Sequence, residues 1–438
     1  MRKIRETLLS TVVVMVRRRA IGTLGSCCFL ALWMVSVSLF VPTSLSQQAA
    51  PEQHLDAGWD GEGDAPDNPG PMATDLSSEL KTTAVDKVIR KVADWQLQHA
   101  QSHFSQDWTF AALYMGIMSA SRVLPEPSYE NAMLDVGRKF DWELGPREID
   151  PTYVGHGQVA GQTYDANNEA LAATYVDLYR IHHEAAMIAA TRRQFDQMMT
   201  EKDNPLAPKW WFCDALFMAP PSWVQLYLAT GNREYLDYMD RQWWATSAFL
   251  YDDHEHLYYR DSNFFVKHEE NGQKLFWSRG NGWVIAVLVR VLDGLPKDYP
   301  SRPKYVTQYR EMAARLASLQ GSDGLWRPGL LDPQSYELPE MSGSGFFIYS
   351  LAWGVDHGIL SRKVYLPIIL KGWQGMVGHV YADGRVGSIQ PIASGPGNYK
   401  PSSSYVYGVG AFLLAGSEMH ELSVHLRGHR HIVQNTNR

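Results

Sequence analysis

The feature of this sequence that most restricts its fold is a succession of amphipathic helical segments. In the first of them, apolar residues recur at intervals of three and four, namely Val85, Val88, Ile89, Val92 and Trp95. This spacing places the side chains on one face of an α-helix. The segment therefore predicts a helix that buries one face against a neighbour.

The clearest helical pair begins at Pro221. An apolar pattern runs from Trp223 to Gly231, a residue type that commonly ends helices. Asn232 can then cap a second helix, which continues through Trp243. Two helices joined this closely must be antiparallel neighbours, so the segment predicts an αα-hairpin.

The same rhythm continues to the C-terminus, and strand-like alternation is scarce. Asp107 can cap a helix early in the chain, and further helices are expected at 282–295, 302–319, 343–353 and 364–380. We therefore predict an all-α fold, a toroid of αα-hairpins spanning residues 77–438. Glycine-rich loops are expected between the hairpins, at 155–157, 278–282 and 321–324.

Composition narrows the possible partners. The aromatic content of 12%, with 15 Trp, suits either a large core or a site that stacks on sugar rings. The formal net charge is -7, and six basic residues precede the N-terminal apolar run. Because nucleic-acid binders normally carry a basic surplus, we expect no nucleic-acid partner.

The N-terminus has the pattern of an export signal. Arg17–Arg19 precede an apolar run at 27–41, and Ser44-Leu45-Ser46 forms a small-x-small cleavage site. We assign 1–46 as a signal peptide and the Gly-, Asp- and Pro-rich stretch 47–76 as a flexible linker. Cleavage would leave Cys213 as the one remaining cysteine, without a disulfide partner. The expected location is the bacterial periplasm or outside the cell, without membrane association after cleavage; the oligomeric state is left open.

One carboxylate stands within an unusually apolar stretch. Asp214 lies between Trp210-Trp211-Phe212-Cys213 and Ala215-Leu216-Phe217-Met218. Such surroundings disfavour an ionised carboxyl group, which suits a general acid. The alternative is a structural role, because Asp214 also precedes an apolar run and could cap a helix.

A second stretch suits an anionic sugar. Arg279 is flanked by Trp277 and Trp283, with Gly280 and Gly282 between. A guanidinium can pair with a carboxylate while indole rings stack on a pyranose. The alternative is a glycine turn with Arg279 in a structural ion pair.

These two stretches, in this order, resemble the unsaturated rhamnogalacturonyl hydrolases of glycoside hydrolase family 105. The chain is also similar, more distantly, to the unsaturated glucuronyl hydrolases of family 88. The likeness runs from about Ser77 to the C-terminus and includes three more stretches: Gly324-Leu325-Trp326-Arg327, Glu340-Met341-Ser342-Gly343-Ser344 and 407–418. It implies an (α/α)6 barrel.

The resemblance also implies the chemistry. The substrate would be an oligosaccharide made by a lyase, with a 4,5-unsaturated uronic acid at its non-reducing end. An acid protonates C4, water adds at C5, and the resulting hemiketal opens and expels the aglycone. The resemblance assigns Asp214 as the acid and base, and Trp277, Arg279 and Trp283 as substrate contacts. Trp211 is also expected to contact substrate.

Two departures from the family pattern concern the site. Where relatives have a second Asp, this chain has Asn167 and Asn168, with Asp165 slightly upstream. An Asn can orient substrate but cannot transfer a proton. Some relatives have a His where this chain has Arg260, which indicates a different aglycone or an additional anionic group. His156, between two glycines, is a further candidate for substrate binding.

Three other functions remain open at this point. An inverting glycosidase on the same fold would need a second carboxylate, for which Asp165 is the best candidate. A catalytically silent sugar-binding protein would keep the Trp residues and tolerate loss of Asp214. A lyase would need a Tyr/His or Lys base near a neutralising Arg, which we cannot place.

No cofactor or metal is expected. The chain has no zinc-binding, phosphate-binding or dinucleotide-binding motif, and hydration of a vinyl ether requires none. The clusters His182-His183-Glu184 and 252–256 are interpreted as a solvated helix face and a wet turn.

Overall fold

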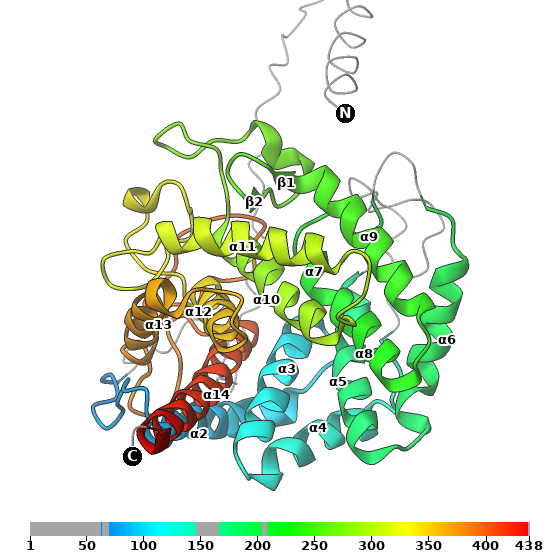
Figure 1. Ribbon diagram of the computed structural model, residues 1–438, viewed down its shortest axis with the longest axis horizontal. Coiled ribbons are helices and arrows are strands. Elements are labelled where there is room, and N and C mark those ends of the chain that lie inside the picture. Colours follow the sequence, from blue (N-terminus) through cyan, green and yellow to red (C-terminus); the bar gives the residue numbers. More distant parts are fainter. Residues whose placement is uncertain (1–62, 64–69, 146–165, 204–207, 437–438) are drawn as a thin grey trace, which may run out of the picture. The chain divides into compact units, whose positions relative to one another are not determined.

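The computed structural model describes residue 63 and residues 70–145, 166–203 and 208–436, with side chains as far as Arg427. All of these belong to one unit, 53–438. Its regular structure is almost entirely helical (Figure 1). The α-helices are α2 (Thr82–Ala100), α3 (Trp108–Val123), α4 (Pro127–Lys139), α5 (Ala166–His182), α6 (Ala186–Thr200), α7 (Ala215–Met218), α8 (Pro220–Thr230), α9 (Glu234–Leu250), α10 (Ser278–Gly294), α11 (Arg302–Ser318), α12 (Met341–Asp356), α13 (Arg362–Val377) and α14 (Val406–Thr436).

An inner layer of helices closes into a ring. Helix α3 contacts α5, which contacts the consecutive helices α7 and α8, and these contact α10. The ring continues from α10 to α12 and from α12 to α14. Helix α14 also contacts α3, so the last inner helix of the chain closes the ring against the first.

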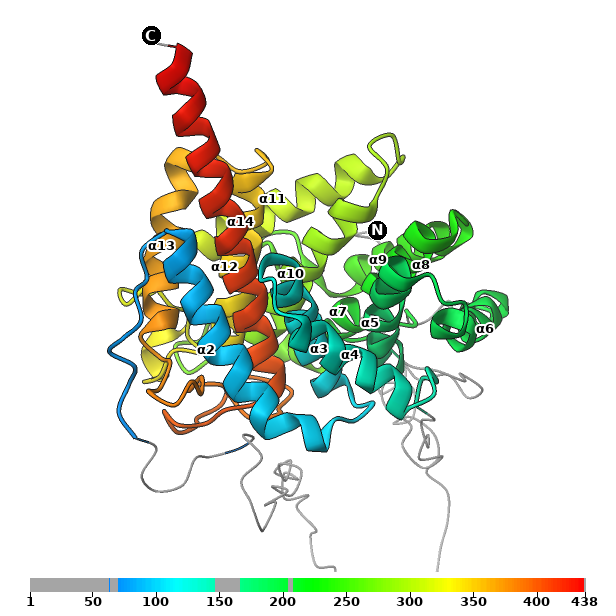
Figure 2. The same ribbon diagram turned by 90° about the horizontal axis from the view of Figure 1, so that it is seen from below.

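An outer layer covers the ring. Helices α4, α6, α9, α11 and α13 contact α3, α5, α8, α10 and α12 respectively, each next to its partner in the sequence. Helix α2 instead contacts α14, from the other end of the chain, and Figure 2 shows the two side by side. Six inner and six outer positions thus alternate along the chain, which is an (α/α)6 barrel. The predicted fold class is confirmed.

The local sequence explains where several helices begin and end. The apolar face of α2 is buried as its spacing predicts. Asp107 caps α3, because its side chain accepts hydrogen bonds from Thr109 N and Oγ1. Gly231 ends α8 in the left-handed conformation, with φ of 73°, and Asn232 Oδ1 accepts a hydrogen bond from Glu234 N at the start of α9.

The expected glycine-rich loop at 278–282 is instead the first turn of α10, so this prediction was wrong. The glycines serve close helix packing rather than a turn. A Cβ on Gly282 would lie 3.2 Å from Gly343 Cα, and one on Gly280 would lie 3.0 Å from Cys213 Sγ. In contrast, 321–324 is a loop as predicted, with Gly324 at φ of 88°.

The short strands of the described region form one hairpin. β1 (Tyr251–Asp252) pairs antiparallel with β2 (Leu257–Tyr258). The turn between them contains the acidic and histidine-rich residues 252–256, and His254 and Asp253 are exposed. This agrees with the wet turn expected from the sequence.

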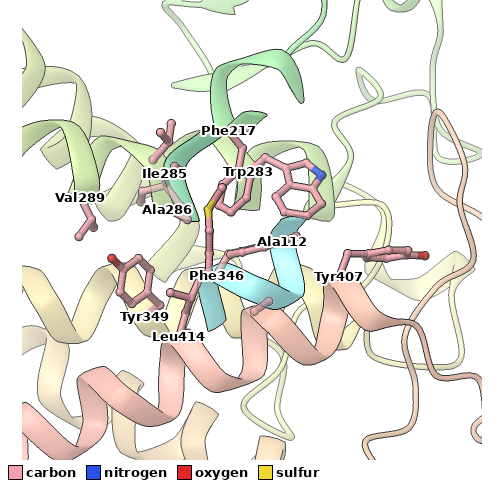
Figure 3. Close-up of a cluster of buried hydrophobic side chains, with 14 of the residues drawn as sticks. Ala112, Phe217, Trp283, Ile285, Ala286, Val289, Phe346, Tyr349, Tyr407 and Leu414 are labelled. Carbon is pink, nitrogen blue, oxygen red and sulfur yellow. The ribbon is translucent and has the colours of Figure 1, made fainter. Parts of the chain in front are cut away.

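Aromatic and aliphatic side chains from the inner helices meet in the centre of the ring. Figure 3 shows Phe217 of α7, Trp283 of α10 and Phe346 of α12 facing one another beside Tyr407 of α14. The ring centroids of Trp283 lie 4.5 Å from those of Phe217 and 4.4 Å from those of Phe346. The centre of the barrel is therefore filled at this level by packed rings.

Part of the predicted linker is structured. Met72 forms a β-bridge with Tyr381, and Ala73 N donates to Val380 O at 2.8 Å. The backbone of residues 380–382 pairs with that of residues 71–73 there, which the linker's composition could not reveal. The predicted signal peptide 1–46, most of the linker, the 155–157 loop with His156, and Asp165 lie outside the described residues. None of the described helices is long and apolar enough to cross a membrane.

Candidate active site

The N-terminal ends of several inner helices converge at one end of the ring. Trp108, the first residue of α3, stacks on Tyr407 of α14, with ring centroids 5.5 Å apart. The guanidinium of Arg279, in the first turn of α10, lies 4.9 Å from the centre of the same tyrosine ring. Helix α7 begins here too, since Cys213 lies against Gly280 of α10. Residues far apart in sequence therefore share this end of the barrel.

Asp214 is at this end, immediately before α7. Although it occupies the N-cap position, its side chain makes no capping hydrogen bond, and it is 14% exposed. Helix α7 is only four residues long, so it has few N–H groups to cap. The next helix, α8, begins with Pro220, which has no N–H that a cap could bind. The carboxylate thus has no capping role, which removes the structural interpretation that the sequence had left open.

Two side chains contact the Asp214 carboxylate. Arg260 Nε lies 3.5 Å from Oδ2, and Cys213 Sγ donates to the same oxygen at 3.4 Å. The surroundings predicted from the sequence were apolar, whereas the structure adds a cation from a segment 46 residues further along the chain. Burial raises the pKa of the Cys213 thiol well above its ordinary value, so this thiol stays protonated and acts as a donor.

Arg260 is itself held in place by a carboxylate, by two aromatic rings and by a backbone hydrogen bond. Its Nη1 donates to Asp261 Oδ2 at 2.7 Å. Its guanidinium carbon lies 5.6 Å from the ring centre of Trp211 and 5.1 Å from that of Phe212. The backbone carbonyl of Arg260 also accepts a hydrogen bond from Cys213 N at 2.8 Å. These contacts hold the guanidinium against Asp214.

Arg279 has a different environment from the one predicted. It is 1% exposed, and its Nη1 and Nη2 donate to the carbonyl oxygens of Gln390 and Pro391 at 2.6 and 2.8 Å. The guanidinium also lies 4.4 Å from the ring centre of Trp277, whose Nε1 donates to Gln390 Oε1 at 2.9 Å. Arg279 and Trp277 therefore secure the loop at Gln390 in this structure, and the predicted pairing with a substrate carboxylate stays a prediction.

Glu340 supports the same loop from the start of α12. Its carboxylate accepts hydrogen bonds from the backbone N–H groups of Ser342, Gly343 and Gln390, and it is fully buried. In the sequence, the segment 340–344 was notable only as one of the stretches that carry the family resemblance. Its role is to cap α12 and to fix residue 390, on which Arg279 and Trp277 also converge.

Trp283 lies inside the ring and has no exposed surface. Its indole packs on Phe217, three residues after Asp214. No described group accepts a hydrogen bond from its Nε1. Direct contact with a sugar ring would require movement of the surrounding side chains, and the prediction that Trp283 binds substrate remains untested.

Asn167 and Asn168 are in the first turn of α5 and are half-buried. The next residue, Glu169, was missed by the sequence analysis. It is 2% exposed and accepts a hydrogen bond from Trp223 Nε1 at 2.6 Å, and burial raises its pKa to about 8. Nothing in its local pattern distinguishes it from a surface glutamate, because the partner that buries it lies 54 residues away on α8.

The structure thus separates the predicted site residues into groups. It brings Asp214, Arg260 and Trp211 together as a partly exposed set, while Trp277, Arg279 and Trp283 form a buried layer beside them. At the N-terminal ends of the inner helices, the barrel thus holds an aspartate that caps no helix, with a guanidinium and an indole beside it. This arrangement in an (α/α)6 barrel suits a carbohydrate-active enzyme.

Comparison with known proteins agrees. The sequence profile of Glycosyl Hydrolase Family 88 matches residues 82–423, and the chain belongs to this family. It is therefore a glycoside hydrolase. The resemblance to families 105 and 88 that the sequence indicated is confirmed, and the profile that matches is that of family 88.

Individual relatives span nearly the whole barrel. The chain is 34% identical over 363 residues to an unsaturated 3S-rhamnoglycuronyl hydrolase of Formosa agariphila, covering 78% of this chain and 92% of that one. It is 30% identical over 382 residues to a protein of the same name from Alteromonas sp. strain LOR, covering 79% and 89%. The solved structure of a family 88 glycosyl hydrolase from Bacteroides vulgatus matches with a TM-score of 0.71 and 29% identity, covering 78% of this chain and 99% of that one.

Proposed function

We propose that this enzyme removes the terminal 4,5-unsaturated uronic acid from lyase-generated oligosaccharides, with Asp214 as the proton donor. The observation that carries the proposal is the carboxyl group of Asp214, which is partly exposed, has no capping role and is contacted by Arg260 and Cys213 at Oδ2. The names of the curated relatives describe hydrolases of unsaturated glycuronyl substrates and support the same reaction.

The reaction needs one group that moves a proton. Protonation of C4 converts the vinyl ether of the unsaturated ring into an oxocarbenium ion at C5. Water then adds at C5 and returns a proton, and the hemiketal opens with release of the aglycone. The contacts of Asp214 described above both involve Oδ2. We therefore assign Oδ1 as the oxygen that gives the proton to C4 and takes one back from water.

Arg260 serves this reaction as a positioning residue. It joins Asp214 to Asp261, and Asp261 is itself buried and accepts a hydrogen bond from Asn263 N at 2.8 Å. A carboxylate held in one orientation is closer to the reactive geometry, which lowers the barrier without any new contact to substrate. The Trp211 indole, against the same guanidinium, is the partly exposed ring in this set and is assigned to stack on the sugar.

The described residues around Asp214 do not favour the alternative of an inverting glycosidase. Such an enzyme needs a second carboxylate, about 6.5–9.5 Å away, to activate water. Asp261 is near in sequence to Arg260, but it is 2% exposed and both of its oxygens accept hydrogen bonds. It cannot serve as that base without breaking its contact with Arg260.

The test is the ultraviolet absorbance of the conjugated double bond while purified enzyme acts on lyase-generated oligosaccharides. Absorbance is expected to fall with wild-type protein and to stay constant with Asp214→Asn. Asp253→Asn, in an exposed turn, is the matched control and should retain activity. Release of sugar from saturated glycosides without loss of absorbance would instead support the two-carboxylate alternative.

The substrate panel should begin with unsaturated 3S-rhamnoglycuronyl oligosaccharides, the substrate class in the names of the two curated relatives. Unsaturated rhamnogalacturonan and arabinogalactan fragments complete the panel. The substrate with the highest kcat/KM identifies the aglycone.

We also propose that the protein is exported. The basic and apolar pattern of 1–46 supports this. Fractionation of the native host, with the N-terminal residue of the mature protein determined by mass spectrometry, is the test. An N-terminus at Gln47 in the periplasm or medium is expected, and full-length protein confined to the cytoplasm would contradict the proposal.

A further inference from the structure

A second cluster of ionisable side chains lies at the C-terminal end of α12. Asp356 is the last residue of this helix, His357 follows it, and Glu418 is on the neighbouring helix α14. One ligand atom from each of the three lies within 4.8 Å of the others. Since α12 has 16 residues, this cluster is roughly 24 Å along the helix from the end that lies near Asp214.

The imidazole of His357 is oriented in the way that metal-binding histidines usually are. Its Nδ1 lies 3.0 Å from Trp353 O, and its ring stacks on the Trp353 indole with centroids 4.5 Å apart. When Nδ1–H donates to this carbonyl, the lone pair is on Nε2, the free side of the ring. Nε2 lies 3.8 Å from Asp293 Oδ1, and the His357 side chain is 45% exposed.

Glu418 lacks the partner that a buried carboxylate requires. Its Oε1 is completely buried, and no described group donates a hydrogen bond to it. The charged side chains that act on it are those of Asp356, Asp293 and Glu421, which are all acidic. A buried carboxyl group in this setting needs a proton or a cation.

Asp356 is prepared for a cation in a complementary way. Its side chain is 4% exposed, and both of its oxygens lie 2.7 Å from His425 Nδ1. It also stands at the C-terminus of α12, where the helix dipole favours positive charge. His425 can thus hydrogen-bond the carboxylate and hold its orientation, as neighbouring groups commonly do for carboxylates that bind metal ions.

We propose that Asp356, His357 and Glu418 bind a divalent transition-metal ion, best matched by Zn²⁺. One imidazole and two carboxylates are suitable zinc ligands, and solvent can supply a fourth. Ligand atoms on one zinc ion lie about 3.3 Å apart, so binding draws the three side chains slightly together. The ion would join α12 to α14, the helix that closes the ring against α3. Its role would be structural, because the chemistry proposed at Asp214 needs no metal.

The test is calorimetric titration of the metal-free full chain, without an affinity tag, with ZnCl₂. One zinc ion per chain is expected, together with a rise in melting temperature of about 3–5 °C at 100-fold the Kd. Glu418→Gln keeps the size of the side chain and removes the charge, while His357→Ala removes a half-exposed ring. Both variants should bind zinc at least 10-fold more weakly.

His254→Ala is the matched control, because His254 also lies beside an acid, Glu255, but on an exposed turn. It should bind zinc as the wild type does. Circular dichroism checks that each variant is folded, and the exposed His357 keeps the test usable if Glu418→Gln unfolds. Failure of zinc to bind at one site per chain, or equal binding by wild type and His357→Ala, would overturn the proposal.

Discussion

The carboxyl groups at the two ends of the helical ring differ in their partners. At the N-terminal ends of the inner helices, Asp214 has Arg260 beside it, and Arg260 is in turn held by Asp261. At the C-terminal end of α12, Glu418 is surrounded by other acids and its Oε1 has no donor among the described residues. The Asp214 carboxylate thus has a cation from the protein beside it, whereas the buried oxygen of Glu418 has neither a donor nor a cation among the described residues.

This difference indicates different uses of a carboxylate. An acid that must give and regain a proton needs defined geometry and access. The contacts of Asp214 fix its position and its side chain is 14% exposed, which suits the proposed role. An acid with no donor and only acidic neighbours costs stability unless a cation binds. We therefore expect substitutions of Asp214 and its neighbour Arg260 to change activity, and substitutions of Glu418 to change stability.

The largest effect is expected for Asp214→Asn. Loss of the proton donor should lower kcat by about 10³–10⁴-fold, because general acid–base catalysis contributes up to about 10⁴-fold. Since the carboxylate caps no helix, the melting temperature should stay close to that of the wild type. Rates from the absorbance assay and a thermal scan test both statements; a large loss of stability would show that Asp214 has the structural role after all.

A smaller loss of activity is expected for Arg260→Met. The guanidinium positions Asp214, so kcat should fall about 10–100-fold while KM changes little. Arg260→Lys keeps the positive charge and should recover part of the rate. An increase in KM with unchanged kcat would mean that Arg260 binds substrate, as the sequence analysis had suggested.

At the other end, Glu418→Gln should stabilise the metal-free protein. Glu418 has a raised pKa in the folded state, so the stability that it contributes is present below its unfolded pKa and is lost as the pH rises. The Gln variant avoids this loss because it carries no charge, so a gain of about 1–3 kcal/mol is expected at pH 8 and little gain at pH 4. Urea unfolding at both pH values, with EDTA present, measures it.

The smallest effect is expected for Glu169→Gln, which tests the same principle at the catalytic end. The pKa of Glu169 is raised to about 8, so its stabilising contribution is lost as the pH rises from about 4.5 through 8. The gain for the Gln variant should be smaller than that for Glu418→Gln, because Trp223 Nε1 already donates to this carboxylate. A gain equal to or larger than that of Glu418→Gln would contradict the contrast between the two ends.

Much of the fold follows from local sequence. The apolar face of α2, the Asp107 cap and the Gly231 stop are each encoded within a few residues, and each is found as predicted. The first turn of α10 is the informative exception. Its glycines indicate a loop when taken alone, but they fit a helix because Gly343 and Cys213 approach them closely.

The candidate site was predictable in its central residue and less so in the roles around it. Asp214 stood out because a carboxylate is rare within so apolar a stretch. The sequence could not show that Arg279 donates to the carbonyls of residues 390 and 391, over 100 positions away. Nor could it show that Arg260, 46 positions from Asp214, lies against it.

The sequence by itself determined the all-α class, the ring of hairpins and the family, and it singled out Asp214 as the candidate acid. Only the tertiary structure decided that this acid caps no helix, that Arg260 is its neighbour and that Asp356, His357 and Glu418 meet. The physical reason is the distance along the chain over which each property is set. Helical periodicity and caps depend on residues three or four apart, whereas the charge environment of a side chain depends on which helices pack together.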